Sequence, residues 1–98
     1  MEIIIKHEEA FKVILKGRLD TTTSNELTLA LNKEEIKENL VIFDFTDLEY
    51  ISSAGLRVLL ALKKQLMAEN KNMEIHNIND VIKEVFNVTG FINILTVK

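Results

Sequence analysis

The sequence lacks cysteine and proline altogether and has only three glycines among its 98 residues. Without cysteine, neither a disulfide framework nor a thiolate metal site can form, so a reducing compartment such as the cytoplasm is the expected location. Without proline, and with so little glycine, no segment has the composition of a flexible linker or a low-complexity tail. The sequence therefore predicts one domain over residues 1–98.

Two further absences narrow the range of functions. No stretch approaches the roughly 20 apolar residues of a membrane span, and the start of the chain is acidic where a signal peptide is positively charged. Twelve basic residues are scattered among fifteen acidic ones, for a net charge of −3, so no basic patch for nucleic acid stands out. We expect a soluble protein without a membrane or nucleic-acid partner.

Hydrophobic patterning divides the chain into short alternating elements. Strands are expected at residues 3–6, 11–16, 40–43, 73–76 and 92–97. The first two are separated by four residues, which predicts an antiparallel hairpin. From residue 11 onward strands alternate with helices, the pattern that builds parallel strands joined by crossovers. The predicted fold class is α/β, a mixed sheet opened by a hairpin with helices packed on it.

Three helices are expected between these strands. The first begins among the hydroxyl residues 21–24, where Thr23 and Glu26 have the spacing of a capping box. The longest covers residues 56–67, and the last begins after Asn79 and ends at Gly90. Residues 40–43 form a continuous apolar run, which indicates a central strand covered on both faces, at least in part.

The most informative segment is Ser52-Ser53-Ala54-Gly55, which lies between the central strand and the longest helix. A hydroxyl at a helix N-terminus meets partial positive charge and unpaired backbone N–H groups, a setting that tolerates phosphate. The alternative is that serine serves here as a helix N-cap alone. Two adjacent serines exceed the need of one cap, and Ala54 and Gly55 leave little side chain to obstruct the approach of a partner.

The segment Tyr50–Leu59, which contains this site, resembles the signature of the STAS domain family of bacterial anti-sigma factor antagonists. Residues 17–20 followed by Thr23, and the helix at 81–86 followed by residues 89–91, agree with the family in order and spacing. The resemblance covers nearly the whole chain. The family often has aspartate where Ser52 stands and a second hydroxyl where Ala54 stands.

The resemblance implies a phosphorylation-controlled partner switch. The unmodified protein would bind an anti-sigma factor that is also a serine-protein kinase and so release a sigma factor. Phosphorylation of Ser53 would end the binding, and a serine phosphatase would restore it. The family pattern places the partner-binding surface at Asp20, Thr23, Ser52, Ser53, Ala54, Gly55, Leu56 and Arg57. The alternative is a STAS-type interaction module in another partner-switching pathway, without a sigma factor.

Catalysis and metal binding are disfavoured by the residues themselves. A serine nucleophile elbow needs Gly-x-Ser-x-Gly, but Ile51 stands two residues before Ser53. His7 is expected in the opening hairpin and His76 in a short strand, as ordinary surface or strand residues, and no carboxylate cluster at ligand spacing accompanies either. Asp44 and Asp47 are expected to end the strand and stabilise a turn. We expect no catalytic activity, no cofactor and no metal.

Overall fold

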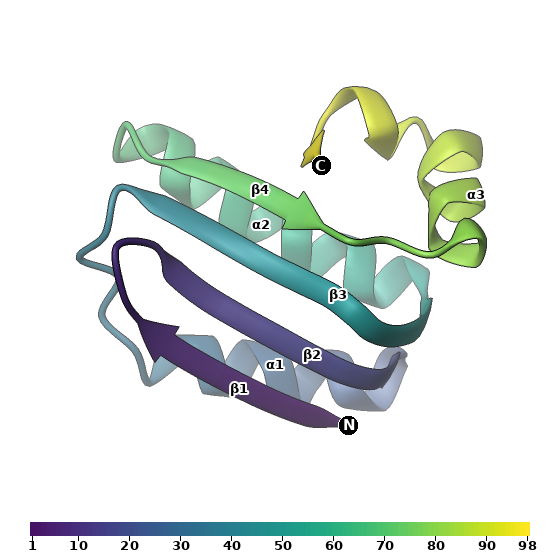
Figure 1. Cartoon of the computed structure of the whole chain (residues 1–98), viewed down its shortest axis with the longest axis horizontal. Helices are drawn as coiled ribbons and strands as arrows, with labels where there is room; N and C mark the ends of the chain where they lie inside the picture. Colours follow the sequence, from purple (N-terminus) through teal and green to yellow (C-terminus); the bar gives the residue numbers. More distant parts are fainter.

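The computed structural model describes all residues from 1 to 98. A five-stranded sheet in the order β1-β2-β3-β4-β5 is accompanied by three α-helices and one short 3₁₀ helix (Figure 1). The elements are β1 (Glu2–His7), β2 (Phe11–Leu19), α1 (Thr21–Asn32), β3 (Leu40–Ile51), α2 (Ser53–Ala68), β4 (Asn72–His76), α3 (Asp80–Thr89), η1 (Phe91–Asn93) and β5 (Thr96–Val97).

The strand directions confirm the predicted topology. β1 pairs antiparallel with β2, and β2, β3, β4 and β5 then pair in parallel. Because each parallel neighbour is reached through a helix or a helical segment, the carboxyl ends of the parallel strands lie at one edge of the sheet. Both α1 and α2 begin at that edge (Figure 1).

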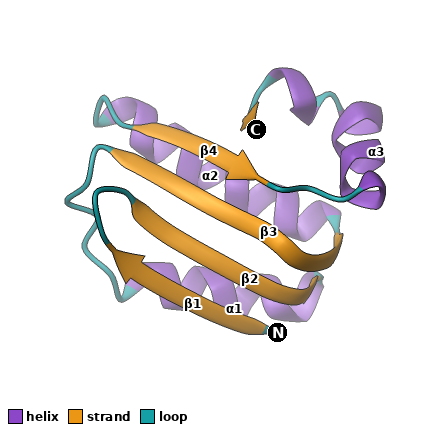
Figure 2. Cartoon of the chain, viewed as in Figure 1, coloured by secondary structure: helices purple, strands orange, loops and turns teal.

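Coverage of the sheet differs from the prediction made for residues 40–43. α1 and α2 lie on the same face of the sheet, and no helix crosses the other face (Figure 2). Along β3, Val41 and Phe43 are fully buried, whereas Ile42 between them is only partly buried. Buried and partly buried residues therefore alternate along this apolar run, as in an ordinary strand with one covered face, because Ile42 points to the uncovered face.

Two predicted boundaries were also wrong. β3 does not end near Asp44 but continues to Ile51, with irregular pairing to β2 that lets the strand bend between Asp44 and Asp47. The last strand covers only Thr96–Val97, because η1 occupies the start of the segment predicted as strand. The apolar content of this segment alone could not show that its first residues form a 3₁₀ helix before the chain pairs with β4.

The core lies between the sheet and the helices. Nineteen buried apolar residues form a single cluster that includes side chains of β2, α1, β3, α2, β4 and α3. The three largest contributions from the central strands are Phe11, Phe43 and Phe45, and the last two pack edge to face. No helix has the length and apolar character needed to cross a membrane.

Candidate functional site

The two serines at the start of α2 have separate roles. Ser52 is the N-cap, with its backbone extended and its Oγ accepting a hydrogen bond from the N–H of Gly55 at 3.3 Å. Ser53 is the first residue of the helix, and its side chain is exposed. The capping role that sequence alone could have given to either serine belongs to Ser52.

The hydroxyl of Ser53 makes no hydrogen bond within the protein, and the backbone N–H groups of Ser53 and Ala54 have no acceptor. These free donors are the positive end of a 16-residue helix. A negatively charged group on the Ser53 oxygen would therefore be held in a favourable field while remaining in solvent. The position is compatible with modification of Ser53 without disturbance of the cap.

Gly55 and Leu56, both members of the predicted partner-binding surface, are buried in this structure. A Cβ at Gly55 would lie 2.8 Å from Leu19 Cγ and 2.9 Å from Ile51 Cγ1. The glycine therefore lets α2 approach β2 and β3 closely, and it does not clear the outer surface for a partner. Leu56 is 3% exposed and belongs to the core.

Asp20 and Thr23 form the N-terminus of α1, beside the start of α2. Thr23 donates its backbone N–H to Asp20 Oδ1 at 3.0 Å, and Asp20 donates its N–H to Thr23 Oγ1 at 2.8 Å. The capping box thus joins Asp20 to Thr23, and the predicted pairing of Thr23 with Glu26 was wrong. The N–H of Ser52 donates to the Leu19 carbonyl at 2.9 Å and so fixes the two helix starts side by side.

The charges at this edge of the sheet are few and mostly free. Hydrogen bonds from the backbone N–H and then the hydroxyl of Thr23 lower the pKa of Asp20 below its ordinary value. Arg57 is exposed on the first turn of α2 and has no ion-pair partner. Within the predicted surface, half-buried Asp20 and exposed Ser53 and Arg57 therefore present one fixed negative charge, one neutral hydroxyl and one positive charge.

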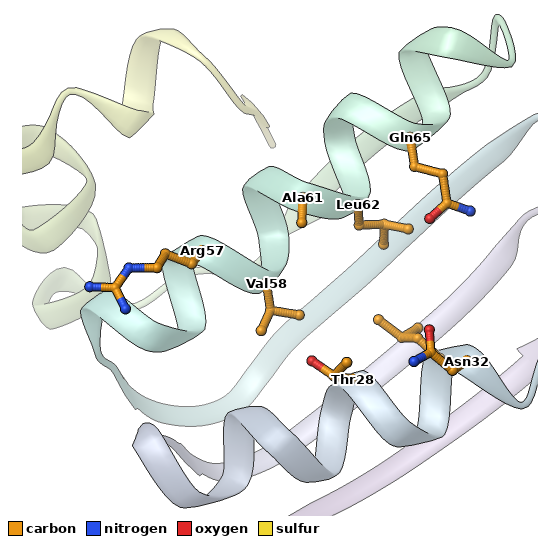
Figure 3. A pocket seen from close by; sticks show the side chains of 8 residues that line it. Thr28, Asn32, Arg57, Val58, Ala61, Leu62 and Gln65 are labelled. Carbon is orange, nitrogen blue, oxygen red and sulfur yellow. The ribbon is translucent and has the colours of Figure 1, made fainter.

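A hollow of about 260 Å³ runs between α1 and α2 (Figure 3). Thr28, Leu31 and Asn32 of α1 face Val58, Ala61, Leu62 and Gln65 of α2 across it. Arg57 lies at the end nearest the N-terminus of α2, with its guanidinium pointing out of the hollow (Figure 3). The hollow is open along its length, so it does not enclose a reaction from water.

Sequence reasoning missed two contacts that shape this edge. The guanidinium of Arg18 lies 4.5 Å from the centre of the Tyr50 ring, across the β2–β3 pairing. Asn79 caps α3 through its Oδ1, which accepts the N–H of Ile82, and its Nδ2 donates to the Leu48 carbonyl at 3.0 Å. The cap was predictable from Asn79 itself, but the bond from its amide to β3 depends on a separation of 31 residues.

Neither histidine contacts Ser53. His7 is bonded to Glu34 and Glu38, and His76 to Glu74. No group of three or more His, Asp or Glu side chains is arranged to hold a metal ion. The site therefore offers an accessible hydroxyl at a helix N-terminus and no neighbouring base to activate it.

Comparisons with known proteins agree with this arrangement. Anti-sigma-B factor antagonist of Listeria monocytogenes is 25% identical, with 100% of this chain and 87% of that protein covered. The antagonist SpoIIAA of Bacillus shares the fold at 17% identity with a TM-score of 0.80 in its unphosphorylated form, covering 99% of this chain and 86% of that one. In its phosphorylated form the TM-score is 0.68 at 18% identity, covering 99% and 89%.

BtrV of Bordetella bronchiseptica, named as a candidate anti-sigma factor antagonist, is 34% identical over 84 residues, which are 85% of this chain and 72% of that protein. The family model of the STAS domain matches residues 3–98. A model that matches almost the entire sequence, together with relatives of this similarity, shows that the chain belongs to the STAS domain family.

Proposed function

We propose that this protein is an anti-sigma factor antagonist whose binding surface is switched off by phosphorylation of Ser53. The unmodified chain binds an anti-sigma factor with serine-kinase activity and thereby frees a sigma factor. The kinase phosphorylates Ser53 with ATP, and a serine phosphatase removes the phosphate. Because the phosphate comes from ATP, we place the switch in the cytoplasm. The chain itself acts as substrate and ligand and does not catalyse a reaction.

One observation carries this proposal: Ser52 caps α2, which leaves the hydroxyl of Ser53 exposed and unbonded. A serine needed for the cap could not be modified without loss of a stabilising hydrogen bond. The names of the relatives support the same kind of partner, and a phosphorylated form exists of SpoIIAA, which shares the fold.

The switch is electrostatic in this proposal. A phosphate on Ser53 adds roughly −1.5 to −2 charges at neutral pH to a surface that must lose water when a partner docks. The free N–H groups of Ser53 and Ala54 stabilise this charge locally, so the fold is retained. Asp20 contributes a further negative charge close by, which increases the repulsion of an acidic partner surface.

The two serines provide a matched test of the modification. The protein, Ser52→Ala and Ser53→Ala are each incubated with ATP and candidate serine kinases from the same genome, and phosphate is mapped by mass spectrometry. We expect phosphate on Ser53 in the wild type and in Ser52→Ala, and none in Ser53→Ala. Ser52→Ala should lose about 1 kcal/mol of stability as an N-cap variant. Phosphate on Ser52, or on neither serine, would contradict the assignment.

Affinity for the kinase tests the switch itself. Ser53→Asp should weaken binding at least tenfold while the circular dichroism spectrum stays unchanged, because only the surface charge differs. Ser53→Ala should bind as well as the wild type and should not be released when ATP is added. Equal affinity of Ser53→Asp and the wild type would exclude charge at this position as the switch.

A further inference from the structure

The face of the sheet opposite α1 and α2, here called the open face, carries no helix (Figure 2). Three isoleucines lie on it: Ile4 of β1, Ile14 of β2 and Ile42 of β3. They are only partly buried, and none packs against the core cluster, unlike Ile3 and Ile5 of β1. Ile4 and Ile14 are direct partners across the hairpin, and Ile42 pairs with Lys12, the neighbour of Ile14 on the same face.

Charges on the open face are separated by sign. On β1 and β2 the charged side chains are the cations Lys6, Lys12, Lys16 and Arg18 and a single carboxylate, Glu2. On β3 and β4 they are the carboxylates Asp44, Asp47 and Glu74, together with His76. The halves meet between β2 and β3, where Lys16 Nζ and Asp47 Oδ2 are 4.0 Å apart.

This distribution is complementary to itself. Consider a two-fold axis parallel to the strands, between β2 and β3, which turns a second copy so that the two open faces meet. β1 then lies over the partner's β4, and β2 lies over the partner's β3. The register of the rows brings Lys6 opposite the partner's Glu74 and Lys16 opposite the partner's Asp47. Each cationic half thus meets an acidic half twice, as an isologous interface requires.

We propose that the open face is a docking surface for a second copy of this chain, in a two-fold dimer of face-to-face sheets. The sheets lie about 10 Å apart and within about 30° of alignment, as in a β-sandwich. The attraction rests on the charge pairs, because in this register Ile14 lies opposite the partner's Asp44 and Ile42 opposite the partner's Lys12. A different protein would need an acidic half and a basic half placed opposite the basic and acidic halves of this face. A second copy of the chain has this arrangement by symmetry.

The size of the face sets the strength of the association. Four strands spaced by about 4.8 Å and about six residues long at 3.3 Å each give a face of roughly 20 by 20 Å. That is below the roughly 800 Å² per partner of a standard stable interface, so the dimer is weak and reversible. Lys98 already binds Glu74 at 3.1 Å, which leaves Lys16 and Asp47, 42% and 60% exposed, as the freest opposed pair.

The dimer leaves the Ser53 site uncovered, because α2 lies on the other face of the sheet (Figure 2). The proposal therefore does not depend on the proposed function. Loss of Ser53 phosphorylation would leave the dimer unaffected, and loss of the dimer would leave phosphorylation unaffected.

Sedimentation equilibrium of the intact chain at 20–500 µM tests the proposal by charge reversal. Lys16→Glu and Asp47→Lys should each weaken self-association at least tenfold, because like charges then meet twice. An equal mixture of the two variants should recover association, since both contacts in the mixed dimer pair opposite charges. The double variant Lys16→Glu/Asp47→Lys should recover it as well. Lys64→Glu, on the outer side of α2, is the matched control and should associate like the wild type.

Three results would overturn the proposal. The first is a wild type that remains monomeric at 500 µM, as expected for a merely solvated face or one used by another protein. The second is an unchanged dimer in Lys16→Glu. The third is failure of the mixture to recover association. Thermal melts by circular dichroism establish that each variant is folded.

Discussion

At Gly55 the hydrogen in place of a side chain decides how closely α2 packs on the sheet. We expect Gly55→Ala to lower the free energy of unfolding by about 1–3 kcal/mol, because the added methyl overpacks against Leu19 and Ile51. The gain of up to about 1 kcal/mol in helix propensity offsets only part of this loss. Urea denaturation followed by circular dichroism measures the difference.

Ser53→Ala is the control for this substitution, because it changes an exposed residue of the same helix turn and should alter stability by less than about 0.5 kcal/mol. An unfolding midpoint of Gly55→Ala equal to or above that of the wild type would show that the helix can move away from the sheet without loss.

Individual residues were predicted well in type and less well in role. The sequence indicated a hydroxyl at the start of α2 and capping side chains before α1. It could not choose between equivalent spacings: Asp20–Thr23 and Thr23–Glu26 both fit a capping box, and the start of the helix decides which one forms. Likewise, the role of Gly55 depends on Leu19, which is 36 positions away and becomes a neighbour only when β2 pairs with β3.

At the scale of elements, His7 ties the hairpin to the segment between α1 and β3. Its Nε2 lies 2.7 Å from Glu34 Oε1, and its Nδ1 lies 2.9 Å from Glu38 Oε2. The hydrogen bond to Glu34, followed by that to Glu38, raises the pKa of His7 above 6.5. His7 and Glu38 line a surface hollow together with Glu35 and Lys37, and the ring of Phe11 meets the imidazole edge to face.

This geometry predicts a pH dependence of stability with a defined sign. A raised pKa in the folded state means that the protonated imidazole is favoured by folding. The contribution is therefore fully present below about pH 6.5, the unfolded value, and is lost as pH rises through the folded-state pKa of His7. Urea midpoints between pH 5 and pH 9 should fall across this range in the wild type.

His7→Gln should remove this dependence, since glutamine cannot take up the proton. The lowered pKa of Asp20 acts in the opposite direction and only in acid, because its contribution is present above about 3.8 and lost as pH falls through its folded value. The pH range in which His7 changes stability does not overlap the range in which Asp20 does. A wild type and His7→Gln variant with the same pH profile would show that the imidazole does not tie these elements together.

Elements were predicted accurately wherever the pattern was long or bounded by strong signals. The hairpin, the parallel order and α2 agree with the structure. The errors arose where tertiary packing decides. Residues 40–43 were predicted to be covered on both faces, although Ile42 faces away from the helices. The C-terminal apolar residues were predicted to form a strand, but they form η1 and a strand of only two residues. Local hydrophobicity does not record which side of a sheet the helices take.

At the scale of the whole molecule, one core joins almost every element. Its members come from β2, α1, β3, α2, β4 and α3, and Leu95 extends the cluster toward β5. β1 joins through Ile3 and Ile5, which pack against the cluster. A division into two units would leave an apolar surface uncovered on each, so the arrangement favours a single cooperative domain over residues 1–98.

We therefore expect two-state unfolding in urea. Circular dichroism at 222 nm reports mainly the helices, whereas the fluorescence of Tyr50, the only tyrosine in a chain without tryptophan, reports β3. Because helices and sheet share one core, both signals should change at the same urea concentration, with a slope of about 1 kcal/mol per molar. Loss of the helical signal at a lower urea concentration than the tyrosine signal would mean that α3 and the C-terminal segment unfold separately. That result would contradict a single cooperative domain.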